Sequence, residues 1–284
     1  MRKIKIALSL LTVLIILATL AGNTHAAPPT QRAKWTVMVY ISGDNNLEDY
    51  VVSDIETELA PTGSSANVQV VALADRGPGY DTSYGDWQTT KLFHVTQGMT
   101  ASPENAVADW GERNFGDKQT LIDFVTWTKA NYPADHYALY FWGHGWNWHP
   151  DFVMQDDTNN DTLDMEEVEA ALPLLGFIDM VGFDGCNMAS IEVQLLWHGH
   201  ATALAHSQEW VGGEGLQYDL ILAQLAANPN MTADQVAIAS SQSATSDKTW
   251  SAVAVDSRFD ALLNAVDQWS VALNNGLGAH RKKY

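Results

Sequence analysis

Hydrophobic and polar positions along the chain predict strands and helices in alternation. Short runs rich in β-branched and aromatic residues are typical of buried strands, and they lie at 35–41, 68–74, 137–142, 178–183, 201–206 and 250–255. Apolar residues at helical spacing predict helices at 47–59, 118–131, 188–197, 218–227, 232–243 and 257–273. This alternation predicts an α/β domain with a mostly parallel central β-sheet flanked by helices.

Polar residues indicate where these elements begin and end. Asp164, with Glu167 three residues later, is typical of a capping box and predicts a helix to residue 172. Residues 80–87 are rich in Gly, Asp and Ser and predict a loop. Residues 89–95 are interpreted as a strand or one arm of a hairpin.

The N-terminus has the pattern of a signal peptide at residues 1–26. Basic residues at 2–5 precede an apolar run at 6–20, and Ala26 ends a cleavage motif of small residues. The run is shorter than the roughly 20 residues of a membrane span. We therefore expect a secreted protein, extracellular or periplasmic, with no stable membrane span after cleavage; an uncleaved N-terminal anchor is the alternative.

The remaining residues predict one domain. A linker is expected at 27–34 and a single folded domain at 35–284, with truncation of that domain at its C-terminus left open. The chain has 46% hydrophobic residues, enough for a core, which excludes overall disorder.

The charge balance excludes one class of partner. The chain has 15 Lys and Arg against 34 Asp and Glu, and nucleic-acid binding requires cations facing the phosphates, so we expect no nucleic-acid partner. Residues 130–247 contain 17 acidic residues and no Lys or Arg. A crevice there would attract cationic peptides; simple solubility of an acidic secreted protein is the alternative.

A single cysteine, Cys186, excludes intrachain disulfides and multi-cysteine zinc sites. Cys186 follows one predicted strand in the turn Asp184-Gly185-Cys186, and His144 follows another in the turn Gly143-His144-Gly145. Carboxyl ends of parallel strands meet at one edge of a sheet, where ligands bind. We expect Cys186 near the N-terminus of the next helix, which favours a thiolate. Inert packing of the thiol is the alternative.

Four segments together resemble the clostripain family of cysteine peptidases, relatives of caspases, gingipains and legumain. They are YFWGHG at 140–145, GFDGCNMASIEV at 182–193, WTVMVYISGDNNLE at 35–48 and SQEWVGGEGLQY at 207–218. The resemblance extends from residue 35 to beyond residue 255 and implies a caspase-like fold.

The resemblance also implies a thiol protease chemistry. Cys186 is then the nucleophile that forms a thioester acyl-enzyme, and His144 is the general acid and base. The backbone N–H groups of Gly145 and Cys186 would form the oxyanion hole. The family typically cleaves after Arg or Lys, so peptide or protein substrates with basic residues are the expected partners.

Asp184 matches the family position that reads the basic side chain, with a helix-capping role as its alternative. Glu209 and Glu214 are weaker candidates for the same role. Trp146 and Trp148 follow the histidine and are candidates for the walls of a substrate cleft, whereas Trp142 is expected in the core.

Two features of the family are less evident here. Members often activate themselves by cutting at a basic residue between the dyad His and Cys, but residues 144–186 contain no Lys or Arg. We expect an enzyme that works as a single chain or is cut by another protease. We expect that the chemistry requires no cofactor. Some members use calcium, and residues 156–161 resemble the start of a calcium loop but fail the EF-hand pattern; a solvated acidic loop is the alternative.

Two rival functions stay open. One is a catalytically idle relative that binds peptides or a protein partner; the presence of both His144 and Cys186 argues against it. The other is a metal-dependent hydrolase using histidines, either His198 with His200 or His144 with His149. No third ligand is evident for the first pair, and surface or core histidines are the alternative. The sequence does not predict an oligomeric state.

Overall fold

The computed structural model describes residues 32–147, 152–244 and 249–280, which belong to one compact unit, Gln31–Tyr284. The predicted signal peptide and residues 27–31 of the predicted linker lie outside the described residues. Among the described helices, none is both long enough and apolar enough to cross a membrane.

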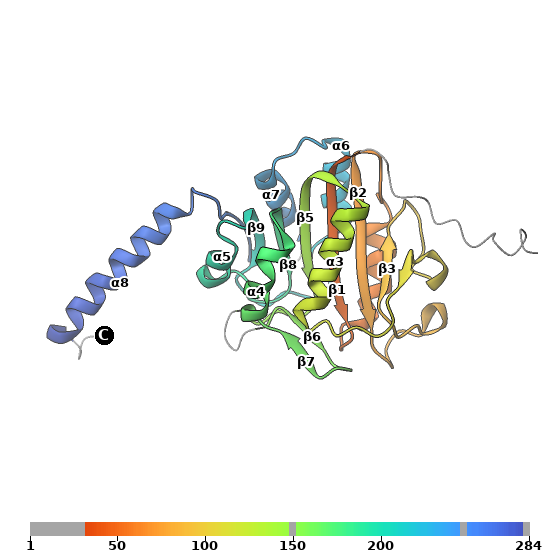
Figure 1. Ribbon diagram of the computed structural model, residues 1–284, viewed down its shortest axis with the longest axis horizontal. Helices are drawn as coiled ribbons and strands as arrows, with labels where there is room; N and C mark the ends of the chain where they lie inside the picture. The colour runs from red at the N-terminus through yellow and green to blue at the C-terminus, as the bar shows by residue number, and fades with distance from the viewer. Residues whose placement is uncertain (1–31, 148–151, 245–248, 281–284) are drawn as a thin grey trace, which may run out of the picture. The chain divides into compact units, whose positions relative to one another are not determined.

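An eight-stranded sheet with the order β10-β9-β8-β5-β1-β2-β3-β4 forms the centre of the fold (Figure 1). Its strands are β1 (Ala33–Gly43), β2 (Val68–Arg76), β3 (Lys91–His94), β4 (Ala108–Asp109), β5 (Ala134–Trp142), β8 (Ile178–Asp184), β9 (Ala201–Ser207) and β10 (Trp250–Ala254). The five strands from β2 to β9 in this order are parallel, and β3, β4 and β10 pair antiparallel at the edges. The predicted α/β class and mostly parallel sheet are therefore confirmed.

Helices cover both faces of the sheet. One face packs against α2 (Glu48–Asp54), the π-helix η1 (Ile55–Leu59), α6 (Tyr218–Ala227) and α7 (Ala233–Ser243). The other packs against α3 (Lys118–Asn131), α4 (Met165–Leu175) and α5 (Ile191–Trp197), and Figure 1 shows α3 and α4 in front of the strands. The remaining helical segments are η2 (Ser83–Gly85), η3 (Pro103–Asn105) and α8 (Asp260–His280).

Strand β1 shows how the sequence builds these two layers. Side chains alternate between the faces of a strand. Val37, Val39 and Ile41 join the core on the α2 and α7 side, whereas Met38 and Tyr40 join the core on the α3 and α4 side. A strand buried on both faces is apolar at nearly every position, and for this reason its sequence is a continuous apolar run.

The strand order reverses beside β1. The chain runs from β1 outward to β2, then returns to β5 on the other side and continues to β8 and β9. Ligands of open α/β sheets bind beyond the carboxyl ends of the strands at such a point. The turns after β1, β5 and β8 all lie at this edge.

Two differences from the sequence predictions concern local structure. The helix predicted at 188–197 begins only at Ile191, because the Ser190 side chain accepts a hydrogen bond from Val193 N and caps it there. The hairpin of β6 (Met154–Asp156) and β7 (Asp161–Leu163) was not predicted. By contrast, Asp164 caps α4 as expected, by accepting from Glu167 N at 2.7 Å.

Candidate active site

The turns after β5 and β8 pack directly against each other. Gly143 N donates to the Asp184 carbonyl at 3.1 Å. A Cβ on Gly185 would lie 2.9 Å from the Gly143 carbonyl oxygen, and one on Gly145 would lie 2.8 Å from the Cys186 carbonyl oxygen. Glycine at both positions therefore allows the two turns to approach closely enough to share one site.

A pocket of about 170 Å³ opens where these turns meet. Three of the predicted site residues, His144, Asp184 and Cys186, line it together. Its other lining residues are Leu47, Trp142, Gly143, Trp210, Val211, Gly212, Gly213 and Gly215. The structure thus brings an imidazole, a thiol and a carboxyl from two strand ends into one cavity.

Cys186 lies in the turn, five residues before α5 begins, so the expectation that it sits near a helix N-terminus is wrong. Its thiol is partly exposed, and Val211 N lies 3.4 Å from Sγ. The next residue, Asn187, has a φ of 59°, a left-handed conformation that Asn tolerates better than most residues. The thiol is therefore positioned by a tight turn and the 211–213 segment, and not by a helix dipole.

His144 is held by the turn that follows β1. Its Nε2 lies 2.6 Å from Asn46 Oδ1. Burial lowers the pKa of His144 below its usual 6.5, and the charge of Asp157 opposes this shift. A ring that donates from Nε2 to the amide oxygen carries its lone pair on Nδ1 when neutral. Asn46 was not predicted as a site residue.

Asp184 is 6% exposed and lies at the wall of the pocket. Its Oδ1 accepts a hydrogen bond from Leu216 N at 3.0 Å, and Leu216 follows the lining residue Gly215. Burial raises the pKa of Asp184 to about 8, and the nearby charge of Asp54 adds to the shift. The alternative role of Asp184 as the cap of a helix carrying Cys186 is excluded, because α5 has its own cap at Ser190.

Two further carboxyl groups lie close to Asp184. Asp54 Oδ2 accepts from Trp142 Nε1 at 2.8 Å, and Glu58 Oε2 accepts from Tyr218 N at 3.1 Å. Burial raises the pKa of Asp54 to about 6 and that of Glu58 to about 8, the latter also through repulsion by Asp54. Neither residue was predicted from the sequence. Their i, i+4 spacing, which places them on one helix face, is the only local signal.

The other predicted substrate-binding residues lie elsewhere. Glu209 and Glu214 are exposed and are not among the residues that line this pocket, so their role stays a prediction. Trp146 packs edge-to-face on Trp210 with ring centroids 5.3 Å apart, and Trp210 lines the pocket. Trp142 is 5% exposed, as expected of a core residue.

Further predictions about the site stay untested. Trp148 and His149 lie outside the described residues. The oxyanion-hole assignment of the Gly145 and Cys186 N–H groups stays a prediction.

The histidines do not form a metal site in the described part of the chain. His198 uses Nδ1 toward the Val255 carbonyl at 2.6 Å and Nε2 toward Asp260 at 3.0 Å. Neither His198 nor His200 belongs to a group of three metal-ligating side chains among the described residues.

Comparisons with known proteins show which family this chain belongs to. Clostripain of Hathewaya histolytica is 29% identical over 233 residues, which cover 72% of this chain and 44% of clostripain. A secreted C11 cysteine protease from Bacteroides thetaiotaomicron, solved with an irreversible peptide inhibitor, has a TM-score of 0.61 at 23% identity. This match covers 75% of this chain and 58% of that one. An inactive zymogen C11 protease from Parabacteroides distasonis has a TM-score of 0.57 at 19% identity, and the match covers 76% of this chain and 59% of the zymogen.

This chain thus spans about half the length of the relatives that it matches. The two solved structures show that the fold is shared. The profile of the clostripain family, peptidase family C11, matches residues 39–271. The chain therefore belongs to the clostripain family.

Proposed function

We propose that this chain is a secreted cysteine endopeptidase that hydrolyses peptide bonds after Arg or Lys. The observation that carries the proposal is that His144, Cys186 and Asp184 line the same pocket. Membership of the clostripain family supports the thiol chemistry, and the buried carboxyl group in the pocket supports the preference for a cationic side chain.

In the proposed reaction, the thiol first attacks the substrate and is later released from the thioester. His144 takes the thiol proton while Cys186 Sγ attacks the scissile carbonyl carbon. His144 then gives this proton to the leaving amine as the C–N bond breaks. The resulting thioester is hydrolysed by a water that His144 deprotonates, which releases the acid product and the free thiol. Backbone N–H groups of Gly145 and Cys186 would stabilise the oxyanion, with each donor lowering the barrier by roughly 3 kcal/mol.

The carboxyl group of Asp184 provides the proposed specificity. A buried carboxylate without a cation is costly, which is why its pKa is raised in the free pocket. A guanidinium or ammonium group entering the pocket would supply the missing counter-charge. A neutral side chain would leave that cost uncompensated, so the pocket discriminates against it.

The test compares the chain with Cys186→Ala and Asp184→Asn on fluorogenic peptides ending in Arg, Lys, Asp, Asn or Leu, under reducing conditions. The chain should cleave after Arg and Lys, and Cys186→Ala should lose all activity. Asp184→Asn should lower kcat/KM for the Arg peptide by at least about tenfold, since each factor of ten corresponds to about 1.4 kcal/mol. Equal cleavage after Leu and Arg would contradict the specificity.

The second candidate function is an idle relative that binds peptides. It would be supported by a chain that cleaves none of the peptides and whose Cys186 reacts no faster than a free thiol. The exposure of Cys186 in the pocket favours the enzyme, because an idle site has no need of an accessible thiol.

A further inference from the structure

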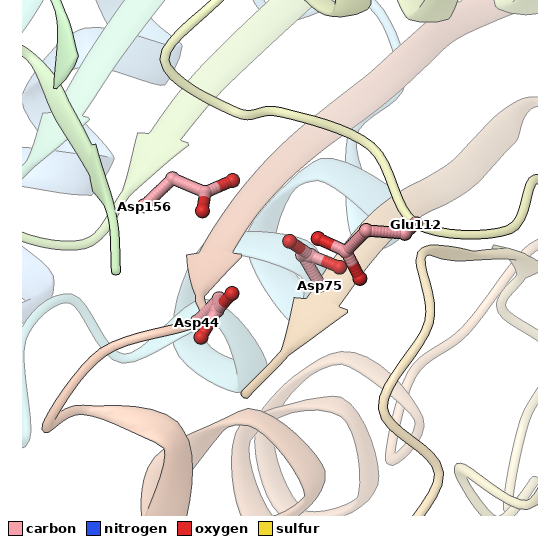
Figure 2. A group of neighbouring side chains, drawn as sticks. All are labelled: Asp44, Asp75, Glu112 and Asp156. Carbon is pink, nitrogen blue, oxygen red and sulfur yellow. The ribbon is translucent and has the colours of Figure 1, made fainter. Parts of the chain in front are cut away.

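Four carboxylates from four separate segments meet at the carboxyl ends of β1 and β2 (Figure 2). Asp44 follows β1, Asp75 belongs to β2, Glu112 lies in the loop after β4, and Asp156 ends β6. Each offers one oxygen, and these oxygens all lie within 4.8 Å of one another. None of the four belongs to the proposed peptidase pocket.

Three of these side chains are almost completely buried, with exposures of 3% for Asp44, 0% for Asp75 and 1% for Asp156. Buried like charges at this distance destabilise a fold unless something compensates them.

One buried oxygen of Asp75 has no hydrogen-bond partner in the described part of the chain. Asp75 Oδ1 accepts from Thr90 Oγ1 at 2.8 Å, but the buried Oδ2 has no hydrogen-bond partner. Figure 2 shows this carboxylate directed toward that of Glu112. Almost all buried polar atoms in proteins are paired, so an orphaned carboxylate oxygen inside an acidic cluster indicates a ligand that binds there.

No cationic side chain compensates the cluster in the described part of the chain, where none of the four acids forms an ion pair. Arg76, next to Asp75 in β2, pairs instead with Glu48 and Asp81. Successive side chains of a strand point to opposite faces, which explains why this guanidinium turns away from the cluster.

Hydrogen bonds from the backbone and from Asn159 orient the carboxylates. Phe115 N donates to Asp156 Oδ2 at 2.8 Å, and Asn159 N donates to Asp156 Oδ1 at 2.8 Å. Asn159 Nδ2 donates to Glu112 Oε1 at 3.1 Å. Ligands held by such outer contacts are typical of metal sites, because the contacts fix the direction of each oxygen.

We propose that Asp44, Asp75, Glu112 and Asp156 bind one calcium ion. Calcium takes six to eight oxygen ligands at about 2.3–2.6 Å, so opposite ligands are about 4.6–5.2 Å apart, in agreement with the spread of this cluster. Magnesium prefers one or two carboxylates and keeps several waters, whereas four carboxylates meet here.

This site differs from the loop that the sequence suggested. Of the acidic residues in 156–161, only Asp156 joins the cluster; Asp161 accepts a hydrogen bond from Asn114 at 2.7 Å. The other three ligands come from distant parts of the chain.

The cluster is connected to the proposed active site through the turn after β1. Asp44 O accepts from Asp157 N at 2.8 Å, and Asn45 Nδ2 donates to the Gln155 carbonyl at 3.1 Å. Two residues after Asp44, Asn46 contacts His144. A cation at the cluster therefore fixes the turn that holds the imidazole, although the binding itself does not depend on the proposed peptidase activity.

The test measures binding and unfolding, not catalysis. The purified chain is stripped with a chelator and titrated with CaCl₂ by calorimetry, and its thermal unfolding is followed with CaCl₂, with MgCl₂ and with neither. We expect one calcium per chain and a Tm that rises with calcium concentration, because a ligand of the folded state alone stabilises it. Magnesium should raise the Tm less.

Two variants remove the site without opening a hole in the core. Asp75→Asn replaces the buried charge by a neutral group of similar shape, and Glu112→Gln does the same at the exposed edge. Each should weaken calcium binding by at least about tenfold. Asp75→Asn should also unfold at the same or a higher temperature than the chelated parent, because it relieves repulsion between acids.

Asp267→Asn, on an exposed part of α8, is the matched control and should bind calcium like the parent. The proposal is overturned if the chain binds no calcium, or if the Asp75→Asn and Glu112→Gln variants bind it as tightly as the parent does. A Tm of the parent that is independent of calcium would also overturn it.

Discussion

The pKa of His144 decides whether the imidazole can act as a base near neutral pH. Burial lowers this pKa below 6.5, so the ring is mostly neutral at pH 7 and becomes charged only in more acidic solution. We expect the His144 ring protons in the Cys186→Ala protein to titrate by NMR with a midpoint below 6.5. Asp157→Asn should lower the midpoint further, because the Asp157 charge favours the imidazolium. A midpoint above 6.5 would contradict the burial argument.

The pKa of Asp184 predicts a pH-dependent preference for basic side chains. The carboxyl group is largely neutral below its pKa of about 8 in the free pocket and ionised above it. The ratio of kcat/KM for an Arg peptide to that for a Leu peptide should therefore rise with pH and level off above about 8. Using the ratio cancels the titration of His144, which affects both peptides. In Asp184→Asn the ratio should not change with pH, and a pH-dependent ratio there would assign the effect to another group.

At the scale of single elements, α2 and η1 carry two acids into the fold beside Asp184. The pKa of Glu58 is about 8 in the folded chain, above its ordinary value of 4.5. The folded state therefore binds more protons than the unfolded one between these values, and this group lowers stability as pH rises through that window.

Glu58→Gln removes this cost. It should raise the free energy of unfolding by about 1–2 kcal/mol at pH 8.5 and by almost nothing at pH 5, a range discounted because the side chain is only half-buried. Denaturant unfolding at the two pH values measures the difference. Glu166→Gln, at an exposed position of α4, is the control and should have little effect at either pH. A loss of stability in Glu58→Gln at pH 8.5 would refute the argument.

The elements that the sequence predicted well are those with a strong local pattern. Helices α3 and α6 occupy the predicted residues, because their apolar spacing is visible locally. Strands β4, β6 and β7 were missed because two or three residues are too few to show a period. The start of α5 was misplaced because Ser190 caps the helix and Met188, which looked like its first residue, is buried in the preceding turn.

The same distinction holds for the candidate site. His144 and Cys186 were found because each stands beside glycines at the end of a strand, a signal confined to a few residues. Asn46, Asp54 and the four-carboxylate cluster were not found, because their partners lie far along the chain. For example, Asn46 and His144 are 98 residues apart, and only the packing of the sheet reveals such pairs.

At the scale of the whole molecule, the absence of basic residues between the dyad positions predicts how the chain matures. Residues 144–186 contain no Lys or Arg, so an enzyme specific for these residues has no site there to cut itself. Mass spectrometry of the incubated active chain should find no cleavage between the two residues. Cys186→Ala is the control for cleavage by contaminating proteases. An autocatalytic cut in this segment would contradict the prediction.

Covalent labelling tests most directly whether Cys186 is the nucleophile and Asp184 selects a basic side chain. The chain is treated with a short peptide that carries an electrophilic ketone after Arg. Peptide mapping by mass spectrometry should locate one adduct on Cys186, formed much more slowly in Asp184→Asn and with a matched Leu peptide. That result would place the nucleophile and the charge-reading carboxyl group in one working pocket. Labelling at other residues, or at equal rates with the Arg and Leu peptides, would contradict the account.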